Sequence, residues 1–315
     1  MNLSVLLPVY NAGKYLEPTI KSILAQDIKD FEFLIINDSS TDESGEVIER
    51  LAADRTNVRV IHHQKNMGLS ATLNEGLNLS TCRFVVRMDQ DDIALPSRLR
   101  IQYLFMKSRP HLAAAGSYVY HMGINESFDK LIILPTEPNE IREKLPNANC
   151  LYHPAVILDR DKVLEAGGYR PEFKNAEDYD LWLRLSRFHD LANIPIPLLR
   201  YRFTLGGMTF GRKWEQLYFA LLAQSSHRLY GESSARIEES AKKVYASQDK
   251  VHFMTMVAQG TATELFELGY EKNVISFLMR FAKDIGWKKA AEIGWKVLKQ
   301  RGGNGCSLKP IGGRG

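Results

Sequence analysis

The chain has 315 residues, with 41 Lys and Arg against 37 Asp and Glu, and its apolar, charged and aromatic fractions are those of an ordinary globular protein. This length suits one large domain with an appendage or two modest domains. The formal net charge of +4 is too small to indicate nucleic-acid binding. The three cysteines, Cys82, Cys150 and Cys306, lie far apart, which argues against a disulfide framework or a zinc site and fits a reducing compartment.

Neither a signal peptide nor a membrane span is indicated. The first residues lack a basic segment followed by a long apolar one, and no run reaches the roughly 18 apolar residues that a span needs. We therefore expect a cytoplasmic protein.

The first 120 residues alternate apolar runs with amphipathic segments, which predicts a parallel sheet of the α/β class with helices on both faces. The expected strands are 3–9, 31–37, 58–62 and 83–88. The expected helices are 15–26, one that includes 47–51, 69–79 and 96–108. Ser40 and Glu43 have the spacing of a capping box for the second of these helices.

After residue 112 the pattern becomes mixed. Strands are expected at 113–120, 153–158 and 194–202, a short helix at 139–144, and a longer helix with Asn175 as its N-cap. Helical patterns follow at 214–230, 251–268 and 272–301. We therefore predict a main domain at 1–205, a helical extension at 206–302 and a flexible tail at 303–315.

Ligands of parallel sheets bind outside the carboxyl ends of the strands. The residues that follow the four strands are therefore the candidate site: Tyr10–Gly13, Asp38–Ser40, His63–Gly68 and the acidic cluster of Asp89, Asp91 and Asp92.

Crowded carboxylates repel one another unless something neutralises them. Mg²⁺ or Mn²⁺ bound by the acidic cluster, chiefly Asp89 and Asp91, and by a diphosphate would relieve the repulsion and act as a Lewis acid. Two alternatives are that Arg87 neutralises part of the cluster, and that the aspartates form a solvated turn before the next helix. We favour the metal, with Asp92 as a further ligand.

Five segments resemble, in order and spacing, the motifs of family 2 glycosyltransferases of the GT-A fold: LPVYNAGKYL, IINDSSTD, NMGLSATLNEGL, MDQDD and AEDYDLWLRL. The resemblance covers about residues 2–205. It implies a Rossmann-like, mostly parallel sheet followed here by a C-terminal helical extension. It also implies a nucleotide-sugar donor carrying UDP or dTDP, a divalent cation and inverting transfer to a glycan or lipid-linked acceptor of surface polysaccharide biosynthesis.

The same resemblance implies the donor contacts. Asp38 would accept the ring N–H of uracil or thymine, and Gly68 would let the backbone approach the nucleotide. The full set is Pro8, Tyr10, Asn11, Asp38, Ser40, Asn66, Gly68, Asp89, Gln90 and Arg202. The alternative for the first three is strand termination, and for Asp38 an ordinary turn or helix cap.

The second acidic group lies at the start of a predicted helix. Inverting transfer needs a base opposite the leaving group, and the family's acidic pair maps onto Glu177 and Asp178. We assign the base to Asp178 and an acceptor contact to Glu177, which is the fallback base. The alternative is a helix start whose acids suit the helix dipole. Trp182 could stack on a sugar, and His153 lies near the expected site, although an isolated histidine is usually structural.

Two positions depart from the family pattern: Leu73 replaces a common arginine and Thr204 replaces a histidine. A catalytically inactive nucleotide-sugar-binding protein is therefore the alternative function. A nicotinamide oxidoreductase is disfavoured because Tyr10–Gly13 does not form a GxGxxG turn.

The segment 272–301 mixes aromatic residues with many lysines. One interpretation is a bundle face with a solvated basic side. The other is a helix that contacts a membrane surface peripherally.

Overall fold

The computed structural model describes residues 3–122, 129–202, 213–267 and 271–303. Nine strands among these residues form one sheet, in the order β3-β2-β1-β4-β8-β6-β9-β5, with β7 paired to β6. The strands are β1 Leu3–Val9, β2 Glu32–Asn37, β3 Val58–His62, β4 Phe84–Arg87, β5 Ile93–Ala94, β6 Leu112–Met122, β7 Asp129–Ile132, β8 Ile157–Asp159 and β9 Asp190–Tyr201.

The predicted parallel sheet is confirmed for the first part of the chain. β2 pairs in parallel with both β3 and β1, and β1 pairs in parallel with β4. Beyond β4 the sheet is mixed, since β8 runs antiparallel to β4 and β6 whereas β9 runs parallel to β6. The α/β class is therefore as expected, and the second half adds antiparallel pairs.

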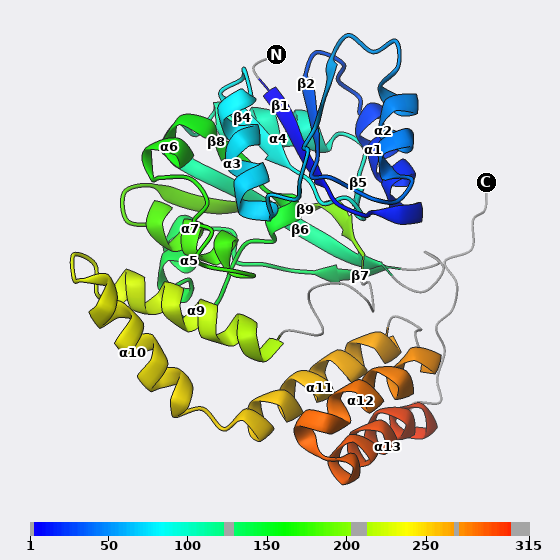
Figure 1. Ribbon diagram of the computed structural model, residues 1–315, viewed down its shortest axis with the longest axis vertical. Coiled ribbons are helices and arrows are strands. Elements are labelled where there is room, and N and C mark those ends of the chain that lie inside the picture. Colours follow the sequence, from blue (N-terminus) through cyan, green and yellow to red (C-terminus); the bar gives the residue numbers. More distant parts are fainter. Residues whose placement is uncertain (1–2, 123–128, 203–212, 268–270, 304–315) are drawn as a thin grey trace.

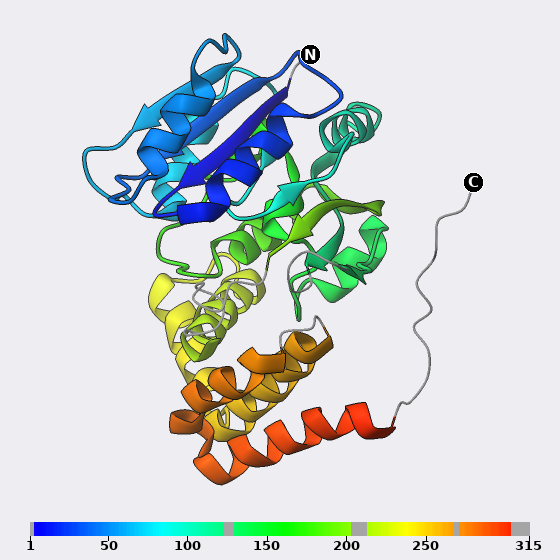
Figure 2. The same cartoon turned by 90° about the vertical axis from the view of Figure 1, so that its right-hand side faces the viewer.

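Helices cover both faces of the sheet (Figures 1 and 2). The helices of the main body are α1 Leu16–Leu24, α2 Ser44–Ala52, α3 Leu69–Leu79, α4 Arg98–Lys107, α5 Pro138–Lys144, α6 Arg160–Glu165 and α7 Glu177–Leu185. Alternate residues of β1 belong to different cores: Val5 and Leu7 pack with α1, α2 and α4, whereas Leu6 packs with α3 and α7. Side chains of a strand alternate between faces, so β1 is apolar throughout because both of its faces are covered.

Beyond the sheet the chain is helical: α9 Lys213–Arg228, α10 Ser234–Ala246, α11 Lys250–Glu267, α12 Glu271–Ile285 and α13 Trp287–Gly303. Ala223 of α9 packs with the core of α7, whereas α11, α12 and α13 share a third core. The sequence pattern did not predict α10. The single segment expected at 272–301 is two helices because Gly286, at φ +85°, ends α12.

Two predicted helix starts are wrong. α2 begins at Ser44 with Glu43 at its N-cap, and the Ser40 hydroxyl instead accepts the amide N–H of Asn11. Ala176 is the N-cap of α7, because Asn175 adopts a left-handed conformation at φ +59° one residue earlier. The strand expected at 153–158 begins only at Ile157, after the short 3-10 helix η3, His153–Ala155.

Within the described residues, no helix is both long enough and apolar enough to cross a lipid bilayer.

Candidate active site

The loop after β1 is tied to the ends of β2 and β4 by side chains. The Tyr10 amide donates to Gln90 Oε1 at 2.7 Å, and the Gly13 amide donates to Asp42 Oδ2 at 2.9 Å. The Asn11 amide donates to the Ser40 hydroxyl at 3.0 Å. Three strand ends that are distant in sequence therefore form one continuous edge, as the sequence predicted.

Within this edge the predicted donor contacts differ in accessibility. Tyr10 is 46% exposed, and the neighbouring Asn11 is also exposed at φ +49°. Pro8 is buried inside β1 beside Ile36, so it shapes the strand and offers no surface to a ligand. Gln90 also donates from Nε2 to the Tyr10 carbonyl at 3.0 Å, so its amide group serves to join β1 to β4.

Asp38 is a buried carboxylate that organises the loop after β3. Its Oδ1 accepts the ring N–H of His63 and the Met67 amide, both at 2.7 Å, and its Oδ2 accepts the Gly68 amide at 2.9 Å. The Asn66 side chain donates to the Asp38 carbonyl at 3.3 Å. Gly68 has φ +84°, a conformation that favours glycine. The aspartate and the loop that sequence analysis assigned to the donor are therefore one hydrogen-bonded unit.

The acidic cluster is partly neutralised from inside the protein. Arg87, the last residue of β4, is buried and pairs with Asp89 at 2.5 Å between Nη2 and Oδ1. The Nε and Nη1 atoms of Arg87 are buried and have no hydrogen-bond partner among the described residues. The alternative that Arg87 neutralises part of the cluster thus applies to Asp89.

Asp91 and Asp92 have different surroundings. Asp92 is fully buried; its Oδ1 accepts the Arg202 amide at 2.8 Å, and its Oδ2 has no partner in the part of the chain that the structure describes. Burial and the two neighbouring aspartates raise the pKa of Asp92 well above its usual value. Asp91 is only half-buried, and burial followed by the charge of Asp89 raises its pKa to about 6. The Arg202 guanidinium donates from Nε to the Asp91 carbonyl at 2.8 Å.

The burial of the three aspartates decides which of them could bind the predicted cation. Among the described residues, no group of three or more His, Cys, Asp or Glu side chains is arranged to hold a metal ion. Asp92 has no exposed surface, so its place as a ligand is corrected to a buried structural one. Asp89 and Asp91 remain at the surface of the site. One or two carboxylates completed by substrate phosphates are the usual magnesium environment in nucleotide enzymes, and this pair fits it.

The second acidic group begins α7. The Asp178 side chain is half-buried; its Oδ2 accepts from Asn149 Nδ2 at 2.9 Å and its Oδ1 from the Tyr179 amide at 2.7 Å. Burial raises the pKa of Asp178, and burial together with Asp178 raises the pKa of Glu177 to about 7. A carboxylate with such a pKa is suited to accept a proton near neutral pH.

The two acidic groups lie within electrostatic reach of one guanidinium. The charge of Arg87 lowers the pKa of Asp91, of Glu177 and of Asp178, in each case against a larger effect of burial. Asp89 also raises the pKa of Glu177. Arg87 therefore connects the carboxylates after β4 electrostatically with those at the start of α7, although the two groups lie almost 90 residues apart in the sequence.

Asp180, two residues after Asp178 on α7, has a different role. It is buried, and both of its oxygens are bonded by the guanidinium groups of Arg170 and Arg184, including the Arg184 Nε contact at 2.9 Å. Arg184 also donates to the Gly168 carbonyl at 2.5 Å. This carboxylate therefore fixes the turn before α7 and is not available to a substrate.

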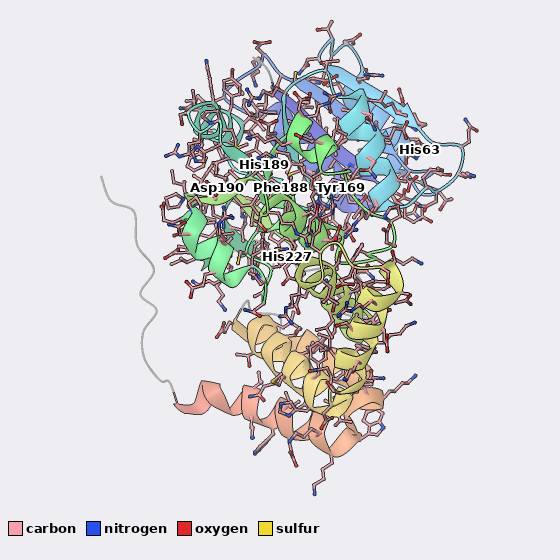
Figure 3. All side chains as sticks on the ribbon, turned by 90° about the vertical axis from the view of Figure 1, so that its left-hand side faces the viewer. His63, Tyr169, Phe188, His189, Asp190 and His227 are labelled. Atoms are coloured by element: carbon pink, nitrogen blue, oxygen red, sulfur yellow. The ribbon has the colours of Figure 1, made fainter. Side chains whose placement is uncertain are left out.

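The predicted acceptor contacts His153 and Trp182 are core residues. His153 Nε2 lies 2.9 Å from the hydroxyl of Tyr169 (labelled in Figure 3), and the His153 ring packs edge-on against Trp182. Tyr169 is itself buried. Trp182 is fully buried, so it has no exposed face on which a sugar could stack. The structural interpretation of both residues replaces the acceptor contact.

Three residues of the site, Asn149, Asn74 and Arg98, were not singled out from the sequence, whereas His63 lies in the predicted segment His63–Gly68 but was given no role of its own. His63 contacts Asp38, and Asn149 holds Asp178. Asn74 donates to the Tyr169 carbonyl at 2.7 Å and accepts its amide at 2.8 Å, which pins the Gly167–Gly168 turn to α3. Arg98 is buried and donates to the Arg87 and Pro154 carbonyls. The contacts of these residues join segments that are far apart in the sequence, so no local sequence pattern predicts them.

Two positions depart from the family pattern of sequence, and the structure describes one of them. Leu73, in place of an arginine, is a buried core residue of α3. Thr204, in place of a histidine, lies outside the described residues.

Comparison with known proteins identifies relatives. A family model described as "Glycosyl transferase family 2" matches residues 4–165. The amylovoran biosynthesis glycosyltransferase AmsE of Erwinia amylovora is 34% identical over 202 residues, covering 63% of this chain and 75% of the relative. The O-antigen biosynthesis glycosyltransferase WbnJ of Escherichia coli is 34% identical over 184 residues, covering 58% of this chain and 71% of the relative.

Solved structures share the fold. Residues 1–349 of S. aureus TarS in complex with UDP-GlcNAc superpose with a TM-score of 0.62 at 17% identity, covering 96% of this chain and 92% of that one. The mannosyltransferase PcManGT of Pyrobaculum calidifontis, in complex with GDP-Man and Mn²⁺, gives a TM-score of 0.56 at 14% identity, covering 91% and 88%.

Proposed function

Because the chain belongs to glycosyltransferase family 2, we propose that it transfers a sugar, with inversion, from a UDP- or dTDP-sugar to a hydroxyl group of a glycan or lipid-linked acceptor. We place this reaction in surface polysaccharide biosynthesis, because the names of two relatives refer to amylovoran and O-antigen biosynthesis. A fold shared with a protein solved with UDP-GlcNAc supports a nucleotide-sugar donor.

The observation that carries the proposal is that two acidic groups, almost 90 residues apart in the sequence, both lie within electrostatic reach of Arg87. One follows β4 and the other begins α7, and Arg87 acts on the pKa values of both. Inverting transfer needs a leaving diphosphate on one side of the sugar and a base on the other. Two separated carboxylate groups at one edge of the sheet can serve these two sides.

The donor nucleotide is assigned to the edge formed by β1, β2 and β3. A carboxylate has about four acceptor positions, and three of those on Asp38 are used by His63, Met67 and Gly68. The fourth can accept the ring N–H of uracil or thymine. The exposed ring of Tyr10 lies beside Asn11 and Ser40 at the same edge and can stack on the base.

In the chemical step the acceptor oxygen forms a bond to the anomeric carbon as the bond from that carbon to the diphosphate breaks. The electron pair leaves with the nucleoside diphosphate, and the hydroxyl proton passes to the base. We assign this proton to Asp178, because its side chain is more accessible than that of Glu177 and Asn149 orients it. Glu177 is the alternative base, because its raised pKa suits it to accept a proton near neutral pH.

Asp91 and Asp89 would hold a divalent cation, while Arg202 would support the diphosphate. Burial, followed by the charge of Asp89, raises the pKa of Asp91, and a cation bound there would stabilise the ionised carboxylate. When bound, Mg²⁺ or Mn²⁺ supplies Lewis-acid stabilisation of the leaving phosphate.

A thermal-shift screen of nucleotide-sugars with and without Mn²⁺ tests the donor assignment. A ligand that binds only the folded protein raises its melting temperature, so a productive donor should stabilise the chain and do so more strongly with the metal. Hydrolysis of the stabilising donor then tests for activity. Binding without hydrolysis or transfer would favour the inactive binding protein instead.

We also propose that α13 rests on an anionic membrane surface. Trp287 and Trp295 are each 64% exposed, and Lys288, Lys289 and Lys296 belong to the same helix. On the same helix, Ala290, Ile293 and Val297 are buried in the third core. Aromatic side chains beside lysines favour the interface of an anionic bilayer.

Flotation with vesicles tests this second proposal. The chain should float with vesicles that contain anionic lipid and remain unbound with neutral ones, and Trp287→Ser with Trp295→Ser should abolish flotation. Met256→Ser is the control, since Met256 is comparably exposed but lies on α11. Unchanged flotation of the double tryptophan variant would contradict the assignment to α13.

A further inference from the structure

His63 lies between two carboxylates that come from different parts of the fold. Its Nδ1 is 2.7 Å from Asp38 Oδ1, directly after β2, and its Nε2 is 2.7 Å from Glu75 Oε2 on α3. The ring directly follows β3 (His63 is labelled in Figure 3), and 9% of its side chain is exposed. Each ring nitrogen therefore faces an acceptor.

This geometry fixes the protonation state of the ring. A neutral imidazole has one N–H donor and one acceptor nitrogen, whereas an ionised carboxylate only accepts. Both contacts can form together only when both nitrogens carry hydrogen, that is, in the imidazolium form. Burial opposes this charge, but Asp38 and Glu75, the two ionised groups that act on the ring, outweigh it and raise the pKa of His63 above its usual value.

We propose that doubly protonated His63 is a positioning residue for the donor nucleotide, because it orients and neutralises Asp38, which holds the loop Asn66–Gly68. This role rests on the proposed function, in which Asp38 and this loop contact the base. A nucleoside diphosphate carries negative charge, and the imidazolium offsets the charge of the nearby buried aspartate. The residue touches no reacting atom, so its effect is on donor affinity.

Loss of the proton weakens this arrangement in a defined order. The lone pair of a neutral ring must face one of the two carboxylates. Glu75 is 42% exposed at its side chain and can turn to water, whereas Asp38 is held by two backbone amides. The Glu75 contact is therefore lost first, and Asp38 keeps its hydrogen bond but loses its neighbouring cation. Because the folded pKa of His63 is raised, the charge is present below the ordinary value near 6.5 and disappears as the pH rises through the higher folded value.

The first test uses the protein alone. Histidine side-chain NMR should give His63 a pKa above that of an unperturbed histidine, and Glu75→Gln should lower it by removing one of the two carboxylates. His62→Gln is the matched control and assigns the neighbouring signal, since His62 contacts Asn37 and Glu49 and is 40% exposed. A His63 pKa at or below the ordinary value would overturn the inference without bearing on the proposed function.

The second test measures the dissociation constants of UDP and dTDP below and above the folded pKa of His63. We expect the nucleotide that binds the chain to bind roughly fivefold more weakly on the alkaline side. His63→Gln should bind weakly at both pH values, His62→Gln should follow the unmodified chain, and kcat should change less than KM in His63→Gln. Equal affinity in His63→Gln and the unmodified chain would overturn the positioning role. If neither nucleotide binds, both the donor assignment and this role fall, while the NMR result still stands.

Discussion

The acidic groups after β4 and at the start of α7 are neutralised differently. In the group at the start of α7, both oxygens of the buried Asp180 are bonded to arginine side chains, and the neighbouring Asp178 is half-buried. In the group after β4, one oxygen of the buried Asp92 is bonded and the other has no partner among the described residues, and the neighbouring Asp91 is half-buried. The comparison separates carboxylates that serve the fold from those that remain available to a substrate. It also shows that sequence proximity alone cannot assign these roles.

The largest effect is expected from Asp178→Asn. The amide keeps the size of the side chain but cannot take the acceptor proton, so kcat should fall roughly 10²–10⁴-fold while UDP binding is retained. Steady-state kinetics with a calorimetric measurement of UDP binding will check this. Equal turnover in the variant would exclude Asp178 as the base and leave Glu177 to be tested in the same way.

Asp180→Asn should act on stability instead. It leaves two arginine side chains without their carboxylate, and the free energy of unfolding should fall by about 3 kcal/mol. Asp190→Asn is the matched control, because Asp190 pairs with Arg142 on the surface at 2.5 Å and exposed pairs contribute roughly 0–1 kcal/mol. Denaturant unfolding of the two variants measures the difference. Similar losses in both would contradict the structural role of Asp180.

Asp91→Asn sharpens the comparison inside the first group. If Asp91 holds the cation, the Mn²⁺-dependent part of nucleotide binding should weaken roughly 10–100-fold. Asp92→Asn should leave this metal dependence in place, because Asp92 is fully buried. Titration of UDP with and without Mn²⁺ distinguishes the two variants, and a loss of metal dependence in Asp92→Asn alone would reverse their roles.

A smaller effect is expected from pH. Burial and Asp178 raise the pKa of Glu177 to about 7, so this carboxyl becomes ionised only as the pH rises through that value. If its ionised form is needed, kcat/KM should increase with pH and be about tenfold lower one unit below the pKa. In Glu177→Gln the midpoint should move to a lower pH. A profile that is flat between pH 6 and 8 in the unmodified chain would show that neither raised pKa limits the reaction.

The sequence predicted the parallel part of the fold well, because the apolar runs of β1, β2, β3 and β4 are local signals. It did not predict the antiparallel pairing of β8 with β4 and β6, which joins segments far apart in the chain. β5 has only two residues, which is too short for a periodic signal.

For the site, the predicted ends of the strands were enough to predict that Tyr10, Asp38 and the acidic cluster lie at one edge of the sheet. Side-chain direction was not predictable in the same way. Trp182 fits a motif but is buried in the core, and Asp91 and Asp92 are adjacent aspartates of which only Asp92 is fully buried. The predicted site segment His63–Gly68 includes His63, but the role of this residue was not predicted, because it depends on a contact with Glu75 of the next helix that the spacing of the two residues does not specify. The predicted domain boundaries at 205 and 302 remain predictions.

The side-chain links between the ends of β1, β2 and β4 have a consequence for binding. Gln90, Ser40 and Asp42 each bond a backbone amide of the loop after β1, so these strand ends are cross-linked before any ligand arrives. A receptor surface that is already rigid loses little conformational entropy when it is occupied, and more of the contact energy then appears as affinity. The same cross-links mean that a displacement at one strand end is carried to the other two, so the edge can respond to a ligand only as a unit.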